Sequence, residues 1–137
     1  MQLIGNNITV RDTIDAFSTT GSFPFNANGF DVTETNIAIT DGVIFNADDA
    51  IAVQSGSHNV LFQHGTIGYQ TYGMSIGSLG QGQAAYANVS SITFADIAAA
   101  NAVHAARFKS WQGGGRDSRK TSLGAASVTT TSRSRCS

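Results

Sequence analysis

Short apolar stretches recur along the first 115 residues, and each has the length of a short β-strand. One series opens with a small polar residue and continues with apolar residues: NITV at 7, NIAI at 36, NVLF at 59 and SITF at 91. A second series lies between its members: GFDV at 29, AIAV at 50, GMSI at 73 and ARFK at 106. No long amphipathic helix or heptad pattern is present, so the pattern predicts an all-β protein.

The spacing of the second series favours one β architecture. Its members start 21, 23 and 33 residues apart, which is too irregular for a propeller blade or a leucine-rich repeat. A parallel β-solenoid tolerates such turns, because its coils stack at about 4.8 Å and keep only their strands in register. An antiparallel β-sandwich is the alternative, but it needs tight hairpin turns, and most linkers here are longer. We therefore predict a partial parallel β-helix of about four coils.

Composition agrees with a single β-rich domain. The chain has 137 residues, of which 41% are hydrophobic, and 15 glycines, which suits a modest core joined by turns. No apolar run is long enough to span a membrane, so we expect no membrane partner. The start, MQLIGNNITV, lacks a basic segment followed by an apolar one, so no signal peptide is visible. The single cysteine, Cys136, cannot form a disulfide within the chain.

The charge reverses near the end of the chain. Residues 1–115 hold three Arg/Lys against eight Asp/Glu, whereas residues 116–137 hold five Arg/Lys against one Asp. The strand pattern also stops at Gly115, and the basic tail lacks the interleaved aromatic residues of a nucleic-acid binder. Back-translated and read in a shifted frame, the tail regains a strand-like pattern. We therefore expect a β-helix domain over 1–115 and a disordered, frameshifted tail over 116–137.

If the second-series strands stack, the polar side chains beside them form one column. The column holds Asn26 and Asn28 before GFDV, Asp48 and Asp49 before AIAV, Tyr72 before GMSI, and Arg107 with Lys109 inside ARFK. Neighbouring side chains of a strand point to opposite faces, so the two aspartates serve one site only if a kink turns them together. The alternatives are a simple turn at the aspartates and a solvent-facing pair at the two cations.

Such a column has the chemistry for cleaving an acidic sugar chain. Glycosidic cleavage needs one protonated carboxyl at the leaving oxygen and one carboxylate that activates water or attacks carbon. Adjacent acids raise the pKa of one of the two, which supplies the proton donor. Arg107 and Lys109 are two residues apart on one strand and so share a face, where they could bind an anionic substrate. The three histidines have no metal-ligand spacing, and we expect no metal.

Four ordered segments resemble the hallmark motifs of glycoside hydrolase family 28, the polygalacturonases. NANGFDV, NADDAIAV, QTYGMSIGSLG and ARFKSWQGG stand where the family has Asn-Thr-Asp, Asp-Asp, a Gly-His-Gly-like segment and Arg-Ile-Lys. FPFNANGFDV and YGMSIGSLGQ look most like the fungal exo-acting members, the galacturan 1,4-α-galacturonidases. The resemblance implies a right-handed parallel β-helix of the pectin-lyase-like kind. It also implies an extracellular monomer that needs no cofactor and hydrolyses α-1,4-galacturonosyl linkages of polygalacturonate or oligogalacturonate with inversion.

The same resemblance implies roles for five residues. Asp49 would be the general acid, and Asp48 would help to activate water. Arg107 and Lys109 would bind the substrate carboxylate, and Asn26 would help to shape the site.

Two positions depart from the family motifs. Asn28 stands where the family has a second water-activating aspartate, and an amide cannot accept a proton at neutral pH. Tyr72 stands where the family has histidine, and a phenol titrates near pH 10. We therefore expect weak or absent hydrolysis. The alternatives are an inactive solenoid that binds oligogalacturonate and a truncated product without function.

Overall fold

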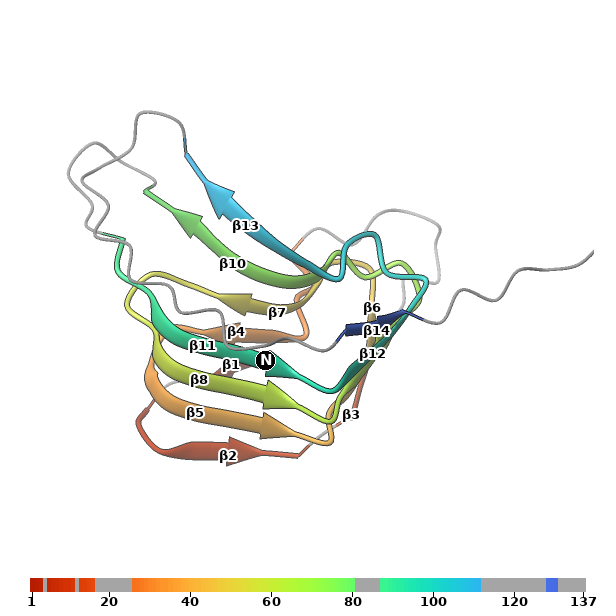
Figure 1. The fold of residues 1–137 in the computed structure, drawn as a ribbon, viewed down its shortest axis with the longest axis horizontal. Helices are drawn as coiled ribbons and strands as arrows, with labels where there is room; N and C mark the ends of the chain where they lie inside the picture. The colour runs from red at the N-terminus through yellow and green to blue at the C-terminus, as the bar shows by residue number, and fades with distance from the viewer. Residues whose placement is uncertain (4, 12, 17–25, 81–86, 112–127, 131–137) are drawn as a thin grey trace, which may run out of the picture.

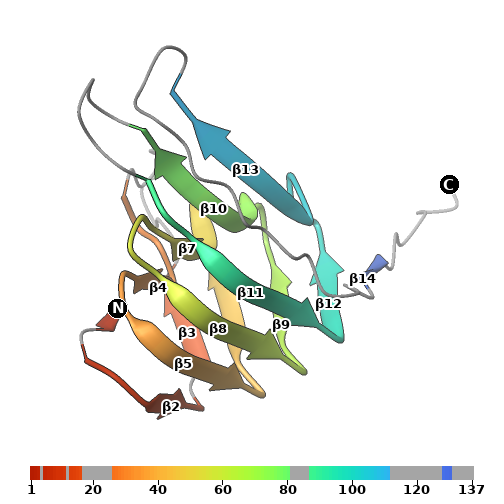
Figure 2. The ribbon, with the colours of Figure 1, turned by 60° about the vertical axis from the view of Figure 1, so that its left-hand side comes forward.

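The computed structural model describes residues 1–3, 5–11, 13–16, 26–80, 87–111 and 128–130. This part of the chain contains fourteen β-strands and no helix. All strand pairs are parallel, and they build three sheets around a common interior (Figures 1 and 2). The prediction of an all-β parallel solenoid is therefore confirmed, and the antiparallel sandwich is wrong.

Each of the four complete coils contributes one strand to each of the three sheets. The first sheet holds β1 (Gln2–Leu3), β4 (Phe30–Val32), β7 (Asp49–Val53), β10 (Gly73–Leu79) and β13 (Ala106–Ser110). The second holds β2 (Ile8–Val10), β5 (Thr35–Thr40), β8 (His58–Gln63) and β11 (Ser90–Ala95). The third holds β3 (Thr13–Ala16), β6 (Val43–Asn46), β9 (Thr66–Gly68), β12 (Ile97–Ala100) and β14 (Val128–Thr130).

The two series of strands in the sequence correspond to two of these sheets. The GFDV, AIAV, GMSI and ARFK segments form β4, β7, β10 and β13 of the first sheet. The NITV, NIAI, NVLF and SITF segments form the second sheet. Four successive coils therefore stack as the spacing predicted, and β13 begins a further one.

The interior of the solenoid consists of apolar side chains stacked in register from coil to coil. In the second sheet Ile37, Val60 and Ile92 are aligned partners, and each is at most 1% exposed. Similar columns run through the other sheets: Phe30, Ile51 and Met74; Val32, Val53 and Ile76; Ile44 and Ile67. In β5, β8 and β11 buried residues alternate with more exposed ones, so every second side chain packs into this interior against the coils above and below.

Small polar residues at the corners allow the chain to turn between sheets. Asn36 and Asn59 are the second residues of β5 and β8 and have positive φ angles of 59° and 54°, a conformation that asparagine tolerates well. They also contact each other across coils, because Asn59 Nδ2 donates a 2.7 Å hydrogen bond to Asn36 Oδ1. These residues therefore serve both as turn formers and as links between coils.

The tail predicted to be disordered lies mostly outside the described residues. Its described part, Val128–Thr130, forms β14 and pairs with β12 in parallel. The prediction of a disordered tail over 116–137 therefore stays a prediction. The frameshift itself stays a prediction.

Gly73 is the first residue of β10, and the backbone of the following coil lies very close to it. Its φ is +86°, and a Cβ atom there would overlap the backbone carbonyl of His104. We expect Gly73→Ala to lower the free energy of unfolding by about 1–3 kcal/mol, as overpacking does. Gly56→Ala is the matched control, because Gly56 also has a positive φ, +94°, but its nearest neighbour would be 3.7 Å away. Equal urea midpoints for the two variants would contradict this account.

Candidate active site

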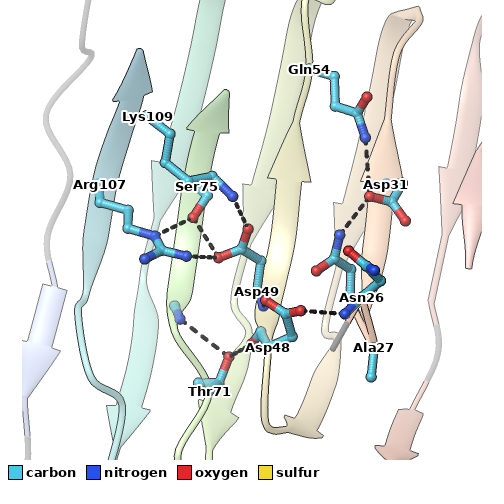
Figure 3. A network of polar contacts seen from close by, with 12 residues as sticks. Asn26, Ala27, Asp31, Asp48, Asp49, Gln54, Thr71, Ser75, Arg107 and Lys109 are labelled. Atoms are coloured by element: carbon cyan, nitrogen blue, oxygen red, sulfur yellow. Dashed lines mark hydrogen bonds and ion pairs between the residues drawn. The ribbon is translucent and has the colours of Figure 1, made fainter. Parts of the chain in front are cut away.

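The predicted column of polar residues lies on the outer face of the first sheet and in the turns that lead into it (Figure 3). Asn26 and Asn28 precede β4, Asp48 precedes β7, Tyr72 precedes β10, and Arg107 and Lys109 lie on β13. Stacking of the coils therefore brings together residues that are up to 60 positions apart in the chain, as in the contact of Lys109 with Asp49.

A kink turns Asp49 towards the same side as its partners. Asp49 is aligned with Gly73, but Ile51 is aligned with Met74, so the register of β7 shifts by one residue at Ala50. Such a bulge places two residues of one strand opposite one of its neighbour and redirects the side chains. Asp49 therefore points to Ser75, which lies one strand away, rather than into the apolar core. The kink that the adjacent aspartates required is present.

Asp49 is the centre of a buried ionic cluster. Its side chain is 1% exposed, and its Oδ1 accepts hydrogen bonds of 2.6 Å from Ser75 Oγ and from Arg107 Nη2. Its Oδ2 accepts a bond of 2.5 Å from Lys109 Nζ. Arg107 Nε also donates to Ser75 Oγ at 2.8 Å, so Ser75 bridges the carboxylate and the guanidinium. One carboxylate thus faces two cations, and the cluster carries a surplus of positive charge.

This environment keeps Asp49 ionised. Burial would raise the pKa of Asp49, but the hydrogen bonds from Lys109, Ser75 and Arg107 outweigh it and lower that pKa below the ordinary value of 3.8. A carboxyl that holds its negative charge so firmly is a poor proton donor at neutral pH. The contacts therefore do not favour Asp49 as the general acid expected from the sequence.

Because the pKa of Asp49 is lower in the folded chain, the stability of the fold should decrease at acidic pH. Since the folded carboxyl has the lower pKa, its contribution is complete above the unfolded value and is lost as the pH falls through the folded one. We expect the melting temperature to be insensitive to this group above about pH 5 and to fall as the pH drops below 3.8. Melting curves at a series of pH values check this. If the melting temperature of an Asp49→Asn variant fell as steeply below pH 3.8 as that of the parent chain, this account would be contradicted.

Asp48 is more open than Asp49 and is held by backbone groups. Its side chain is half-buried, and its Oδ2 accepts a 2.8 Å hydrogen bond from the backbone N–H of Asn26. Its Oδ1 accepts one of 2.8 Å from the backbone N–H of Asp49. The carbonyl of Asp48 also accepts bonds from Thr71 Oγ1 at 2.7 Å and from the Tyr72 N–H at 3.0 Å. Asp48 therefore ties together the turns of three successive coils.

Tyr72 contacts the cationic side of the cluster. The guanidinium carbon of Arg107 lies 4.7 Å from the centroid of the Tyr72 ring, which is the geometry of a cation–π contact. Tyr72 therefore helps to hold Arg107 in place.

Three residues that the sequence did not single out complete the arrangement. Ser75 bridges Asp49 and Arg107, as described above. Asp31 on β4 accepts hydrogen bonds at Oδ1 from Asn28 Nδ2 at 2.8 Å and from Gln54 Nε2 at 3.2 Å. Asn46 is fully buried, and its Nδ2 donates to the carbonyls of Ala27 and Asp49 at 2.9 and 2.8 Å. Their positions in the sequence could have indicated Asp31 and Ser75, because each lies between two apolar residues of a strand and so faces away from the core.

Two other features were sought in the described part of the chain. There, no group of three His, Cys, Asp or Glu side chains could hold a metal ion. No helix long and apolar enough to cross a membrane occurs in that part either.

Fold and site together define a parallel β-helix protein whose outer face carries a cluster of carboxylates and cations. Residues 1–121 match the sequence profile of Glycosyl hydrolases family 28, and the chain belongs to this family. The fold is therefore the family's right-handed β-helix.

Individual relatives agree with this assignment. The chain is 54% identical over 114 residues to "Probable exopolygalacturonase C" of Aspergillus flavus, a match that covers 83% of this chain and 26% of the relative. It is 56% identical over 114 residues to the Aspergillus terreus protein of the same name, covering 82% and 26%. "Polygalacturonase-2" of Solanum lycopersicum is 41% identical over 90 residues, covering 65% of this chain and 19% of the relative. The chain thus spans about a quarter of the length of the fungal relatives.

A solved structure shares the fold. The crystal structure of endo-xylogalacturonan hydrolase from Aspergillus tubingensis superposes with a TM-score of 0.69 at 24% sequence identity. The match covers 82% of this chain and 31% of that chain.

Proposed function

We propose that this chain hydrolyses α-1,4-galacturonosyl linkages of polygalacturonate or oligogalacturonate, from the chain end and with inversion. The observation that carries the proposal is the cluster of Asp48, Asp49, Arg107 and Lys109 on one face of the solenoid. Two cations face one buried carboxylate, so a positive charge is left for the carboxylate of a galacturonate unit. The similarity to fungal proteins named exopolygalacturonase supports the exo mode. An extracellular, monomeric enzyme without a cofactor belongs to the same proposal.

In this proposal the two adjacent aspartates have different roles. Asp48 donates the proton to the leaving oxygen, because it is the more open of the two and contacts no cation in the described residues. Asp49 holds Arg107 and Lys109 in the positions from which they bind the substrate carboxylate. Asn26 shapes the site through its backbone hydrogen bond to Asp48. Tyr72 fixes the guanidinium of Arg107.

Binding of oligogalacturonate without turnover is the second candidate function. Asn28 favours it, because an amide cannot take a proton from water as a carboxylate does. The two candidates share the cationic cluster and differ only in the release of reducing ends.

Lys109→Ala tests substrate binding by the cationic cluster, which both candidate functions require. We expect this variant to weaken trigalacturonate binding by about tenfold or more, because it removes a charge-assisted hydrogen bond to the substrate. Arg11→Ala is the matched control, since Arg11 is an exposed cation that pairs with Asp41 on another face. Calorimetric titration measures binding, and a reducing-sugar assay on the same samples measures turnover. Equal affinities for both variants would exclude the proposed anion site.

A further inference from the structure

We propose that Asn46 is a positioning residue for the proton donor Asp48, because it fixes the spacing of two neighbouring turns. This inference rests on the proposed hydrolysis and deepens it. The two turns are residues 26–28, which precede β4, and residues 46–49, which join β6 to β7. Two separate links connect them, an inner one through the side chain of Asn46 and an outer one through the side chain of Asp48.

The inner link is the side-chain amide of Asn46. This side chain is fully buried, and its Nδ2 donates to the carbonyl of Ala27 at 2.9 Å and to that of Asp49 at 2.8 Å. Both protons of the amide are therefore used, one in each turn. The backbone N–H of Gly29 also donates to the Asp49 carbonyl, at 2.9 Å. The inner link thus joins the turns through groups that carry no charge.

Packing does not explain an amide at this position. Ile44 and Asn46 are the two buried residues of β6, and Ile44 is aligned with Ile67 in the apolar interior. Asn46 Oδ1 is buried and has no hydrogen-bond partner among the described residues. A buried polar atom without a partner costs free energy, whereas an apolar side chain of similar size carries no such cost. A polar residue that breaks the apolar pattern in this way, next to the acid pair, indicates a role in the site.

The outer link depends on the protonation of Asp48. Its Oδ2 accepts from the Asn26 N–H and its Oδ1 from the Asp49 N–H, both at 2.8 Å (Figure 3). In the proposed reaction Asp48 carries a proton and directs one oxygen to the leaving group. Hydrogen bonds to a neutral carboxyl are weaker than those to a carboxylate, so the outer link weakens at that step. The inner link does not change with the charge of Asp48, and it therefore keeps the acid in place while the proton moves.

Asn46→Ala in the whole chain, with trigalacturonate as substrate, tests this inference. We expect kcat for reducing-sugar release per folded molecule to fall by about 10–100-fold, the cost of displacing a catalytic group by about 1 Å. KM should change by less than about threefold, because Arg107 and Lys109 lie on β13, two strands away from β7. Asn46→Leu, which fills the space without the donors, should lose turnover equally. Urea unfolding gives the folded fraction of each variant.

Ser57→Ala is the matched control. Ser57 is also fully buried, and its Oγ donates to the carbonyl of Val32 at 2.9 Å. It links the same two coils as Asn46, but beyond the ends of β4 and β7 rather than before their starts. Its loss should lower the stability of the fold and leave kcat per folded molecule unchanged.

The leaving group separates placement of the acid from a general loosening of the site. A 2,4-dinitrophenyl galacturonide releases a phenolate that needs no proton, so Asn46→Leu should hydrolyse it within about threefold of the parent rate. Equal losses on this substrate and on trigalacturonate would overturn the inference, because Asn46 would then not act through Asp48.

Two other results would also overturn it while leaving the proposed function intact. One is a parent-like kcat of Asn46→Leu on trigalacturonate, and the other is failure of both Asn46 variants to fold, which would make Asn46 a purely structural residue. A folded parent chain that binds trigalacturonate but releases no reducing sugar would overturn the hydrolytic function, and the role of Asn46 with it.

Discussion

Asp48→Asn is expected to lower galacturonide hydrolysis by about 10²–10⁴-fold, the range that a general acid contributes. The amide cannot give a proton to the leaving oxygen, yet it is almost the same size as the carboxyl. Its single oxygen keeps one of the two backbone hydrogen bonds, from Asn26 or Asp49, that the carboxylate accepts at 2.8 Å. The fold and the cationic cluster should therefore persist, and trigalacturonate binding should change little.

Asp96→Asn is the control for this prediction. Asp96 is an exposed acid whose Oδ2 lies 3.6 Å from His64 Nε2 and which has no part in the proposed site, so its loss should leave turnover unchanged. Reducing-sugar release and binding are measured on the same preparations, which separates lost chemistry from lost affinity. If Asp48→Asn kept more than a tenth of the parent rate, the proton donor would have to be sought elsewhere, with Asp49 as the first candidate.

Two of the three sheets could be predicted from the sequence because their strands begin at visible breaks. The polar residues Asn36, Asn59 and Ser91 mark the starts of the second-sheet strands, and each adopts a positive φ there. The third sheet could not be separated in the same way. It begins after corners of only one or two residues, such as Asp41 and Gly42, within a nearly continuous apolar alternation. The corners are visible only once the coils are stacked.

The candidate site was predictable as a set of residues but not as a set of roles. Motif order placed the acids and cations in one column, and the register of β7, β10 and β13 brings them together. The state of Asp49 depends on its burial and on three donors from other coils, which no local pattern reveals. Asp31 and Ser75 were missed for a related reason, since a polar residue between apolar ones looks like an ordinary solvent-facing strand position.

Asp49→Asn is expected to lower the free energy of unfolding by about 3 kcal/mol, the lower end of the range for breaking a buried ion pair. The variant leaves Arg107 and Lys109 without their common counter-ion and gives Ser75 a different partner. The lower end applies because the side chains of Arg107 and Lys109 are still 25% and 30% exposed, so water can compensate part of the loss. Urea unfolding followed by circular dichroism measures the change.

Asp41→Asn shows how this ion cluster differs from a surface pair. Asp41 pairs with Arg11 at 2.8 Å, but the two side chains are 50% and 74% exposed, and such pairs contribute about 0–1 kcal/mol. Equal urea midpoints for Asp49→Asn and Asp41→Asn would mean that the buried ion cluster stabilises the fold no more than a surface pair does. The difference also bears on function, because an Asp49 variant can lose turnover by unfolding. Its activity must therefore be divided by its folded fraction, and the loss that remains measures how far Asp49 positions Arg107 and Lys109 for the substrate.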